Sequence, residues 1–256
     1  MTLSLGFSPC PNDTFVFHAL VHGLVDGPGF AQPVYADIDV LNARALADDL
    51  DVVKVSYGVL PDLSGYTLLA SGGALGRSCG PLVLTRSPGE SLVGKTVAVP
   101  GEQTTAYLLL RLWDPGFGGV EVMPFDTIMP AVRDGRVDAG LVIHESRFTY
   151  RDYGLHAVAD LGDWWEDETG LPIPLGAIVA RSGLDTAAIE SAIRASVEYA
   201  WAHPEASRDY VLAHSQELAP EVVDAHIALY VNELTRDLGD EGRRAVDELL
   251  RRARGL

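Results

Sequence analysis

The stretch LNARALADDLDVVKVSY, residues 41–57, holds the pattern that decides the fold. Apolar residues recur at helical spacing in its first half, an acidic turn follows, and the last part is a β-branched run typical of a buried strand. A second stretch, MPAVRDGRVDAGLVIH at residues 129–144, reads in the same order. When the two are aligned, Asp51 falls over Asp138 and Tyr57 over His144. The pattern predicts two related helix–strand units.

The alternation of strand and helix extends over most of the chain. Ahead of each unit the sequence predicts a strand, a turn and a helix, LSLGFSPCPNDTFVFHAL at residues 3–20 and TVAVPGEQTTAYLLLRL at residues 96–112. Such alternation is typical of an α/β fold. From residue 185 on, only helices are expected, and the turn-rich stretch 87–95 is a candidate crossing between two lobes. Strands are predicted at residues 3–7, 34–40, 52–56, 66–70, 82–85, 96–99, 120–123, 139–143, 157–161 and 175–180.

Open parallel sheets bind ligands at the carboxyl ends of their strands, where loops lead into helix N-termini. Four segments satisfy that description: residues 8–14, 54–57, 101–105 and 144–147. We therefore expect these segments to meet at one cleft.

The first of these turns, SPCPNDT at residues 8–14, concentrates unusual chemistry. Pro11 ends the strand, Asn12 or Asp13 is a good N-cap, and Thr14 is predicted to begin the helix. Together they would present a helix end to a ligand, although capping alone also explains these residue types. Cys10 is either a small buried residue or a nucleophile at a helix N-terminus, with no histidine close to it in sequence.

The second turn, PGEQTTAY at residues 100–107, is the stronger anion candidate. Gly101 allows close backbone approach, and Thr104 and Thr105 add hydroxyl groups at a helix start. The alternative is a single N-cap with a neighbouring threonine. Neither a GxxxxGK[ST] nor a GxGxxG motif occurs, so nucleotide binding has no motif support.

Two cations stand out from the acidic background. Lys54 lies inside the apolar strand VVKVS, where it needs a carboxylate partner or a ligand, unless the strand is an edge strand that lets Lys54 reach water. Arg77 lies in the glycine-rich segment SGGALGRSCGP, residues 71–81, which reads as a mobile lid, a hinge lining or a plain surface loop. In a lid, Arg77 could bind a carboxylate through two hydrogen bonds.

Among seven histidines, His144 is the best candidate for acid–base chemistry. It ends an apolar strand and precedes Glu145, and a neutral imidazole there can abstract a proton near neutral pH. A structural histidine is the alternative. His18 and His22 have metal-ligand spacing on a helix, but the HExxH motif is absent. The remaining four, His156, His203, His214 and His226, read as ordinary.

Composition limits the class of protein. The net charge of −17 disfavours binding to nucleic acid or to an anionic membrane, so an anionic ligand needs a locally positive site. Cys10 and Cys79 are too few for a disulfide framework, although one disulfide between them stays open. The start of the sequence shows no signal peptide, and no run reaches the length of a membrane span. We expect a cytoplasmic protein.

Several motifs together resemble one enzyme family. The segments SPCPNDTFVFHALVHG, KVSYG, SGGALGR, AVPGEQTTAY, DAGLVIHESRFTY and LPIPLGAIVAR occur in order along nearly the whole chain. They are similar to those of the 1,4-dihydroxy-6-naphthoate synthases of the futalosine route to menaquinone. The resemblance implies the two-lobed fold of periplasmic binding proteins with a central cleft, here with lobe 1 at residues 1–86 plus 177–256 and lobe 2 at residues 87–176.

The same resemblance implies an activity and a set of residues. The enzyme would be a carbon–carbon lyase that converts cyclic dehypoxanthine futalosine, a carboxylate, to 1,4-dihydroxy-6-naphthoate and dihydroxyacetone, without a metal or organic cofactor. His144 would be the proton acceptor, held by a neighbour such as Glu145. Independently of the resemblance, the sequence leaves two roles open for the helices after residue 185, to wrap one lobe or to form a homodimer contact. Substrate contacts would come from Lys54, Val55, Ser56, Thr104, Thr105 and Ala106, with Asn12, Asp13, Thr14 and Arg77 as further candidates.

Two alternatives remain at this stage. The chorismate dehydratases of the same pathway share the fold, although the SPCPNDTF and HESRFTY segments favour the synthases. A solute-binding protein would use the same cleft to capture a small carboxylate without changing it.

Overall fold

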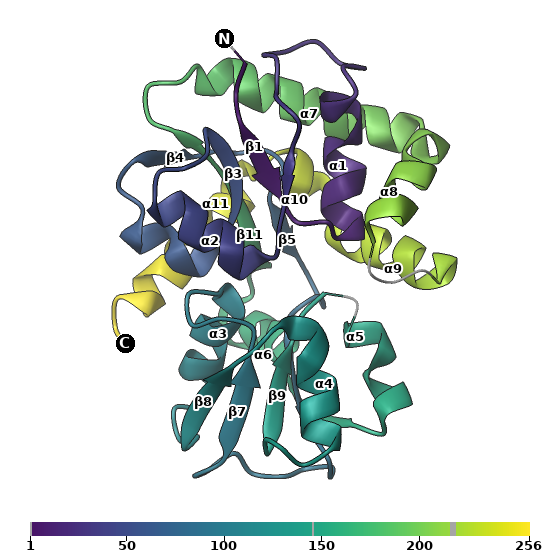
Figure 1. Cartoon of the computed structure of the whole chain (residues 1–256). Coiled ribbons are helices and arrows are strands. Elements are labelled where there is room, and N and C mark those ends of the chain that lie inside the picture. Colours follow the sequence, from purple (N-terminus) through teal and green to yellow (C-terminus); the bar gives the residue numbers. More distant parts are fainter. Residues whose placement is uncertain (1, 145, 216–218) are drawn as a thin grey trace.

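The structure is a computed structural model that describes residues 2–144, 146–215 and 219–256. Two lobes lie one above the other in Figure 1, and each contains one β-sheet. Within the described residues, none of the helices combines the length and the apolar character needed to cross a bilayer.

The sheet of the first lobe has the strand order β2-β1-β3-β11-β4, and β5 also pairs with β11. Strand β3 lies in the interior of the sheet, parallel to β1 and antiparallel to β11. Its burial on both sides explains the continuous apolar run around Lys54. The strands are β1 (Leu5–Phe7), β2 (Val34–Tyr35), β3 (Val52–Ser56), β4 (Tyr66–Leu68), β5 (Ala74–Gly76) and β11 (Ile173–Arg181).

Helices cover this sheet on both sides. Helix α1 packs against α7, α8 and α9, and α2 packs on β3. Phe7 of β1 stacks on Phe17 of α1 with ring centroids 4.7 Å apart. The helices are α1 (Pro11–Val21), α2 (Ile38–Leu46), α7 (Thr186–Ala202), α8 (Arg208–His214), α9 (Pro220–Tyr230), α10 (Glu233–Arg236) and α11 (Gly239–Ala253), with 3₁₀ turns at Tyr57–Asp62 and Pro204–Ser207.

The sheet of the second lobe has the order β10-β6-β9-β7-β8. Strands β9, β7 and β8 are parallel to one another. Strand β6 is antiparallel to β9, and β10 is antiparallel to β6. The strands are β6 (Leu82–Thr85), β7 (Thr96–Val99), β8 (Gly119–Val122), β9 (Ala139–Val142) and β10 (His156–Asp160). The helices are α3 (Thr105–Trp113), α4 (Phe125–Arg133), α5 (Ser146–Thr149) and α6 (Leu161–Thr169), with a 3₁₀ turn at Tyr150–Tyr153.

The two lobes repeat one topology, as the aligned stretches predict. The order β2-β1-β3 recurs as β8-β7-β9, with an antiparallel strand added beside β3 and beside β9. Asp51 accepts a hydrogen bond of 2.8 Å from the amide of Ser4, next to β1, and Asp138 accepts one of 3.0 Å from the amide of Thr96 in β7. The two aligned aspartates therefore form equivalent hydrogen bonds to the backbone at the start of equivalent strands, β1 and β7.

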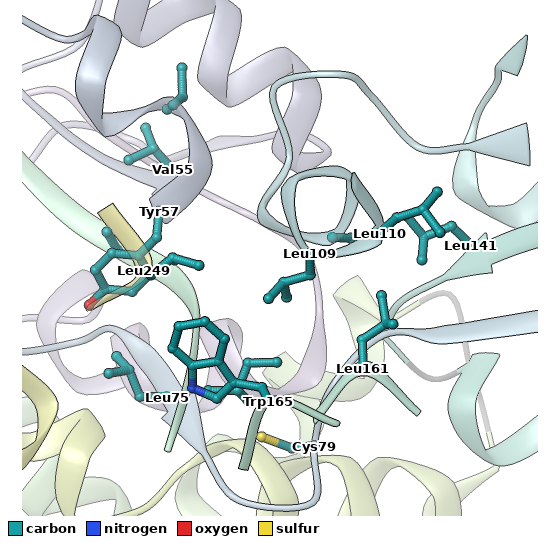
Figure 2. Close-up of a cluster of buried hydrophobic side chains, with 14 of the residues drawn as sticks. Val55, Tyr57, Leu75, Cys79, Leu109, Leu110, Leu141, Leu161, Trp165 and Leu249 are labelled. Atoms are coloured by element: carbon teal, nitrogen blue, oxygen red, sulfur yellow. The ribbon is translucent and has the colours of Figure 1, made fainter. Parts of the chain in front are cut away.

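A shared hydrophobic cluster joins the lobes below the cleft. It contains Val55, Tyr57 and Leu249 of the first lobe and Leu109 and Trp165 of the second, all fully buried. Figure 2 shows these side chains gathered in one cluster. The lobes therefore meet over an apolar surface rather than only through connecting strands.

Several sequence-based boundaries need correction. Residues 38–40, predicted as strand, begin α2, and the glycine-rich segment 71–81 contains the short strand β5. Because β6 pairs with β9 and β10, the chain crosses between the sheets ahead of Leu82 rather than at residues 87–95, and it returns ahead of Ile173.

Candidate active site

A cleft lies between the two lobes, at the carboxyl ends of β1, β3, β7 and β9. It leaves about 640 Å³ of space between the atoms that line it, part of which is open to solvent, and this is within the range of small-molecule sites. All four segments selected from the sequence contribute to it. The lining residues are Ser8, Asn12, Asp13, Ile38, Lys54, Ser56, Ala74, Cys79, Pro81, Thr104, Thr105, Ala106, Ile143, His144, Leu175, Gly176, His226 and Tyr230.

Lys54 forms a buried ion pair with Asp13 in the floor of the cleft. The two residues are 5% and 1% exposed, and the Lys54 ammonium donates a hydrogen bond to Asp13 Oδ1. The Asp13 carboxylate also accepts from Ser8 Oγ at 2.7 Å and from Asn12 Nδ2 at 2.9 Å. The carboxylate partner that the sequence required is therefore present, and because β3 is an interior strand the edge-strand alternative is wrong.

The first turn is capped differently from the prediction. Cys10, not Asn12 or Asp13, is the N-cap residue of α1, Pro11 is its first helical residue, and no side chain caps this end. Asn12 and Asp13 line the cleft instead, whereas the Thr14 hydroxyl donates to the Cys10 carbonyl at 3.0 Å and does not reach the cleft.

His144 follows β9 and faces the cleft from the second lobe. Its backbone φ is +56°, its ring lies edge-on to Phe125 at 5.1 Å between centroids, and its Nδ1 is 3.3 Å from Cys10 Sγ. Burial lowers the pKa of His144 to about 4; the Asp13 charge opposes this shift, and Lys54 adds to it. The imidazole is thus neutral near pH 7 and can accept a proton. Its neighbour Glu145 lies outside the described residues.

A second histidine, His226 of α9, is 1% exposed and lines the same cleft. Its ring is nearly parallel to that of His144, with centroids 6.4 Å apart. Asn12 donates through Nδ2 to the Asp13 carboxylate, so Asn12 Oδ1 accepts the 2.9 Å hydrogen bond from His226 Nε2. Burial, followed by the charges of His144 and Lys54, lowers the pKa of His226 well below its ordinary value.

The N-terminus of α3 forms the opposite wall. Thr104 is its N-cap and accepts from the Tyr107 amide at 3.1 Å. The Thr105 hydroxyl accepts from the Gly58 amide at 3.1 Å and donates to the Leu175 carbonyl at 2.7 Å, so it bridges the lobes. First-turn N–H groups of a helix have no partner within it and attract anions, and those of α3 lie beside the cleft.

The structure brings most of the predicted site residues together. Asn12, Asp13, Lys54, Ser56, Thr104, Thr105, Ala106 and His144 line the cleft. Val55 does not, because the alternation of β3 turns it into the core, where it is fully buried.

Arg77 also lies outside the cleft lining, on the molecular surface. Its guanidinium binds Glu166 of α6 and Glu241 of α11 at 3.2 and 2.8 Å, and the Gly170 carbonyl at 3.2 Å. It joins two elements from different lobes at the crossing, so it is not a substrate residue in this geometry.

The sequence analysis did not select His226 or Tyr230, and it did not place Cys10 beside a histidine. His226 and Tyr230 share one face of α9, where burial raises the pKa of Tyr230. No local signal marks them, because they reach the cleft only through the packing of the C-terminal helices on α1.

The other histidine pair has a structural environment. The rings of His18 and His22 are 4.4 Å apart and lie against Tyr210, and His22 Nδ1 donates to the His18 carbonyl at 2.8 Å. Over the described part of the chain, no group of three or more metal-ligating side chains is gathered.

Comparison with known proteins identifies the family. The model of a family described as menaquinone biosynthesis matches residues 3–255. A 1,4-dihydroxy-6-naphtoate synthase of Streptomyces coelicolor is 59% identical over 261 residues, which cover 98% of this chain and 93% of the relative. The chain belongs to the menaquinone biosynthesis family. A second family member of the same name, from Thermus thermophilus, is 54% identical over 260 residues, 99% of this chain and 95% of its own length.

The fold expected from the resemblance is confirmed by a solved structure. A Candida albicans protein described as having the generic periplasmic binding protein structural fold superposes with a TM-score of 0.68 and 14% identity, over 100% of this chain and 91% of that one. This member of the menaquinone biosynthesis family therefore has the α/β, two-lobed architecture of periplasmic binding proteins.

Proposed function

We propose that this chain is a carbon–carbon lyase that converts cyclic dehypoxanthine futalosine to 1,4-dihydroxy-6-naphthoate and dihydroxyacetone in menaquinone biosynthesis. Two relatives above 50% identity over almost their whole length carry the synthase name. The observation in the structure that supports this activity best is His144, a neutral base at a strand end in a closed cleft.

The chemistry follows from that base. His144 removes a proton from the spirocyclic substrate, and the electrons released break a ring carbon–carbon bond. The electron pair of that bond goes to the leaving fragment, and the His144 imidazolium returns the proton to it, so the fragment leaves as dihydroxyacetone. Formation of the aromatic naphthalene supplies the driving force. The protein contributes one base and the placement of the substrate, which are large terms when the reacting groups are held in a fixed orientation.

The substrate's carboxylate is placed at the N-terminus of α3. The backbone N–H groups there favour an anion, and Thr104, Thr105 and Ala106 all line this wall. Lys54 is already paired with Asp13, so the two side chains together carry no net charge in the cleft. The Asp13 charge also opposes the effect of the Lys54 ammonium on the His144 imidazole.

In this proposal, the first lobe consists of residues 2–81 plus 173–256 and the second lobe of residues 82–172. This division follows the membership of the strands in the two sheets. Relative motion of these lobes would admit the substrate and exclude water once closed. We place the enzyme in the cytoplasm, and the homodimer stays a prediction.

The activity is tested with purified protein, cyclic dehypoxanthine futalosine and EDTA in place of added metal, with products followed by mass spectrometry. We expect the masses of 1,4-dihydroxy-6-naphthoate and dihydroxyacetone to appear in equal amounts. In a parallel incubation, consumption of chorismate instead of cyclic dehypoxanthine futalosine would indicate the dehydratase. Cyclic dehypoxanthine futalosine that binds but stays unchanged would indicate a binding protein. Either of these results would refute the proposed function.

A further inference from the structure

His144 and Cys10 belong to different lobes but contact each other across the cleft. Cys10 precedes α1 in the first lobe, and His144 follows β9 in the second. Their Sγ and Nδ1 atoms lie 3.3 Å apart. This is a side-chain contact from the first lobe to the ring of the base.

Cys10 is placed as a partner of the base rather than of the substrate. It is 5% exposed and is not among the residues that line the cleft, whereas His144 is. The ring nitrogen turned toward Cys10 is Nδ1, so Nε2 is the nitrogen left for a proton from the substrate. In neutral histidine one ring nitrogen carries the proton and the other has the lone pair, and a hydrogen bond to one fixes the state of the other.

Further contacts join the two lobes beside the cleft, and we take this arrangement as the closed one. The Gly58 amide donates to Thr105 Oγ1, and Asn42 Nδ2 donates to the Gln103 carbonyl at 3.4 Å. The backbone of Gly58 lies so close to Thr104 that an added Cβ would be 3.0 Å from its carbonyl oxygen. The approach of Cys10 to His144 belongs to this closed arrangement.

Resting on the proposed function, we propose that Cys10 is a positioning residue that prepares the base when the lobes close. The Cys10 sulfur accepts a hydrogen bond from His144 Nδ1–H, which holds the ring in the tautomer whose Nε2 lone pair faces the substrate. In an open enzyme the two lobes separate and this partner is withdrawn. Base strength and orientation are then completed only around a bound substrate, which protects the open cleft from unproductive proton transfer.

The decisive measurement is the tautomer of His144, read from the ¹⁵N shifts of its ring nitrogens with 1,4-dihydroxy-6-naphthoate bound. The signal is assigned by its loss in His144→Gln. We expect the proton on Nδ1 in the wild type and a shift toward the Nε2–H form in Cys10→Ala. A wild-type ring with its proton on Nε2 would overturn the proposal, and this readout does not depend on turnover.

Kinetics supply the second arm. Cys10→Ala should lower kcat by about 10- to 100-fold, the scale known for partners that orient metal-ligating histidines, with KM changed less than about threefold. Cys10→Ser, whose hydroxyl can still accept from Nδ1–H, should recover part of the lost kcat. Equal kcat in all three proteins, or equal losses in both variants, would refute the positioning role.

A matched control comes from the far side of α1. Ser196 is fully buried, accepts from the Leu20 amide at 3.1 Å and donates to the Val16 carbonyl at 2.6 Å, away from the cleft. Ser196→Ala therefore loosens the same helix without touching the base. It should keep the wild-type tautomer and kcat within about twofold. If wild type itself fails to convert the substrate, the proposed function fails while the tautomer measurement still decides the role of Cys10.

Discussion

Replacing Asp13 with asparagine should destabilise the protein strongly, because it leaves the Lys54 ammonium buried without its counter-charge. Lys54 is 5% exposed and Asp13 1% exposed, so solvent cannot replace the lost carboxylate. Breaking a buried ion pair by removing one partner costs about 3–5 kcal/mol. For a chain of this size, that corresponds to a fall in Tm of roughly 6–20 °C.

The neighbouring hydrogen bonds add to this loss. Ser8 Oγ and Asn12 Nδ2 both donate to the Asp13 carboxylate, and an amide at position 13 offers one acceptor oxygen where the carboxylate offers two. Removal of both charges in Asp13→Asn/Lys54→Met should recover most of the stability, since neither buried charge then remains. The difference between the double variant and the sum of the single variants measures the coupling of the pair.

The assay is urea unfolding at pH 7 of the wild type, Asp13→Asn, Lys54→Met and the double variant. Asp49→Asn, which removes an exposed partner of Arg44, is the matched control and should change the free energy of unfolding by less than about 1 kcal/mol. A loss below about 1 kcal/mol in Asp13→Asn, or no recovery in the double variant, would contradict the reasoning, because a buried pair must show both effects.

Three further outcomes are expected. The rate should stay level from pH 8 to about pH 5.5 and fall as the pH approaches 4, because burial lowers the pKa of His144 to about 4 and only the neutral ring is a base. A fall centred near pH 6.5 in a stopped-flow profile would contradict the lowered pKa, because that is the range of an ordinary histidine. Gly176→Ala should raise KM and lower the free energy of unfolding by about 1–3 kcal/mol, because the new Cβ would lie 2.7 Å from Lys54 Cε. Unchanged steady-state kinetics and unchanged urea unfolding would contradict this, because they would show that Lys54 has room to move. Arg77→Ala should change stability by less than about 1 kcal/mol and leave KM within twofold, since Arg77 binds Glu166 and Glu241 at the surface; a large rise in KM would return Arg77 to the site.

The linear sequence predicts the strands well where apolar runs are short and bounded. The predicted strands 52–56, 82–85 and 96–99 match β3, β6 and β7 residue for residue. The prediction extends too far at residues 34–40, because Val34–Tyr35 is a short outer strand and the apolar residues after it belong to the first turn of α2. The strand β5 was hidden by glycines that suggest a loop.

The site could be predicted only in part, because its electrostatics depend on residues far apart in sequence. The position of His144 at a strand end is a local signal and marks it directly. Lys54 needs a carboxylate partner on the same physical grounds, but that the partner is Asp13 follows only from the pairing of β1 with β3. His226 gives no local signal at all, since α9 reaches the cleft through helix packing.

The equivalence of the two lobes was visible in the alignment of Asp51 with Asp138. Hydrogen bonds of these carboxylates to the start of β1 and β7 give that alignment a physical cause. The alignment also places Tyr57 and His144 at equivalent strand ends, although Tyr57 is fully buried in the shared core and His144 faces the cleft. The repeat thus predicts where the chain presents a side chain, but the packing around it decides its role.

The most direct test of the central claim is the single-turnover rate of His144→Ala with saturating cyclic dehypoxanthine futalosine, measured by rapid quench beside a binding measurement of the same variant. If His144 is the base, the rate should fall by about 10²- to 10⁴-fold, while the dissociation constant of the substrate changes only a few-fold. A rate close to wild type, with substrate bound normally, would show that another group removes the proton.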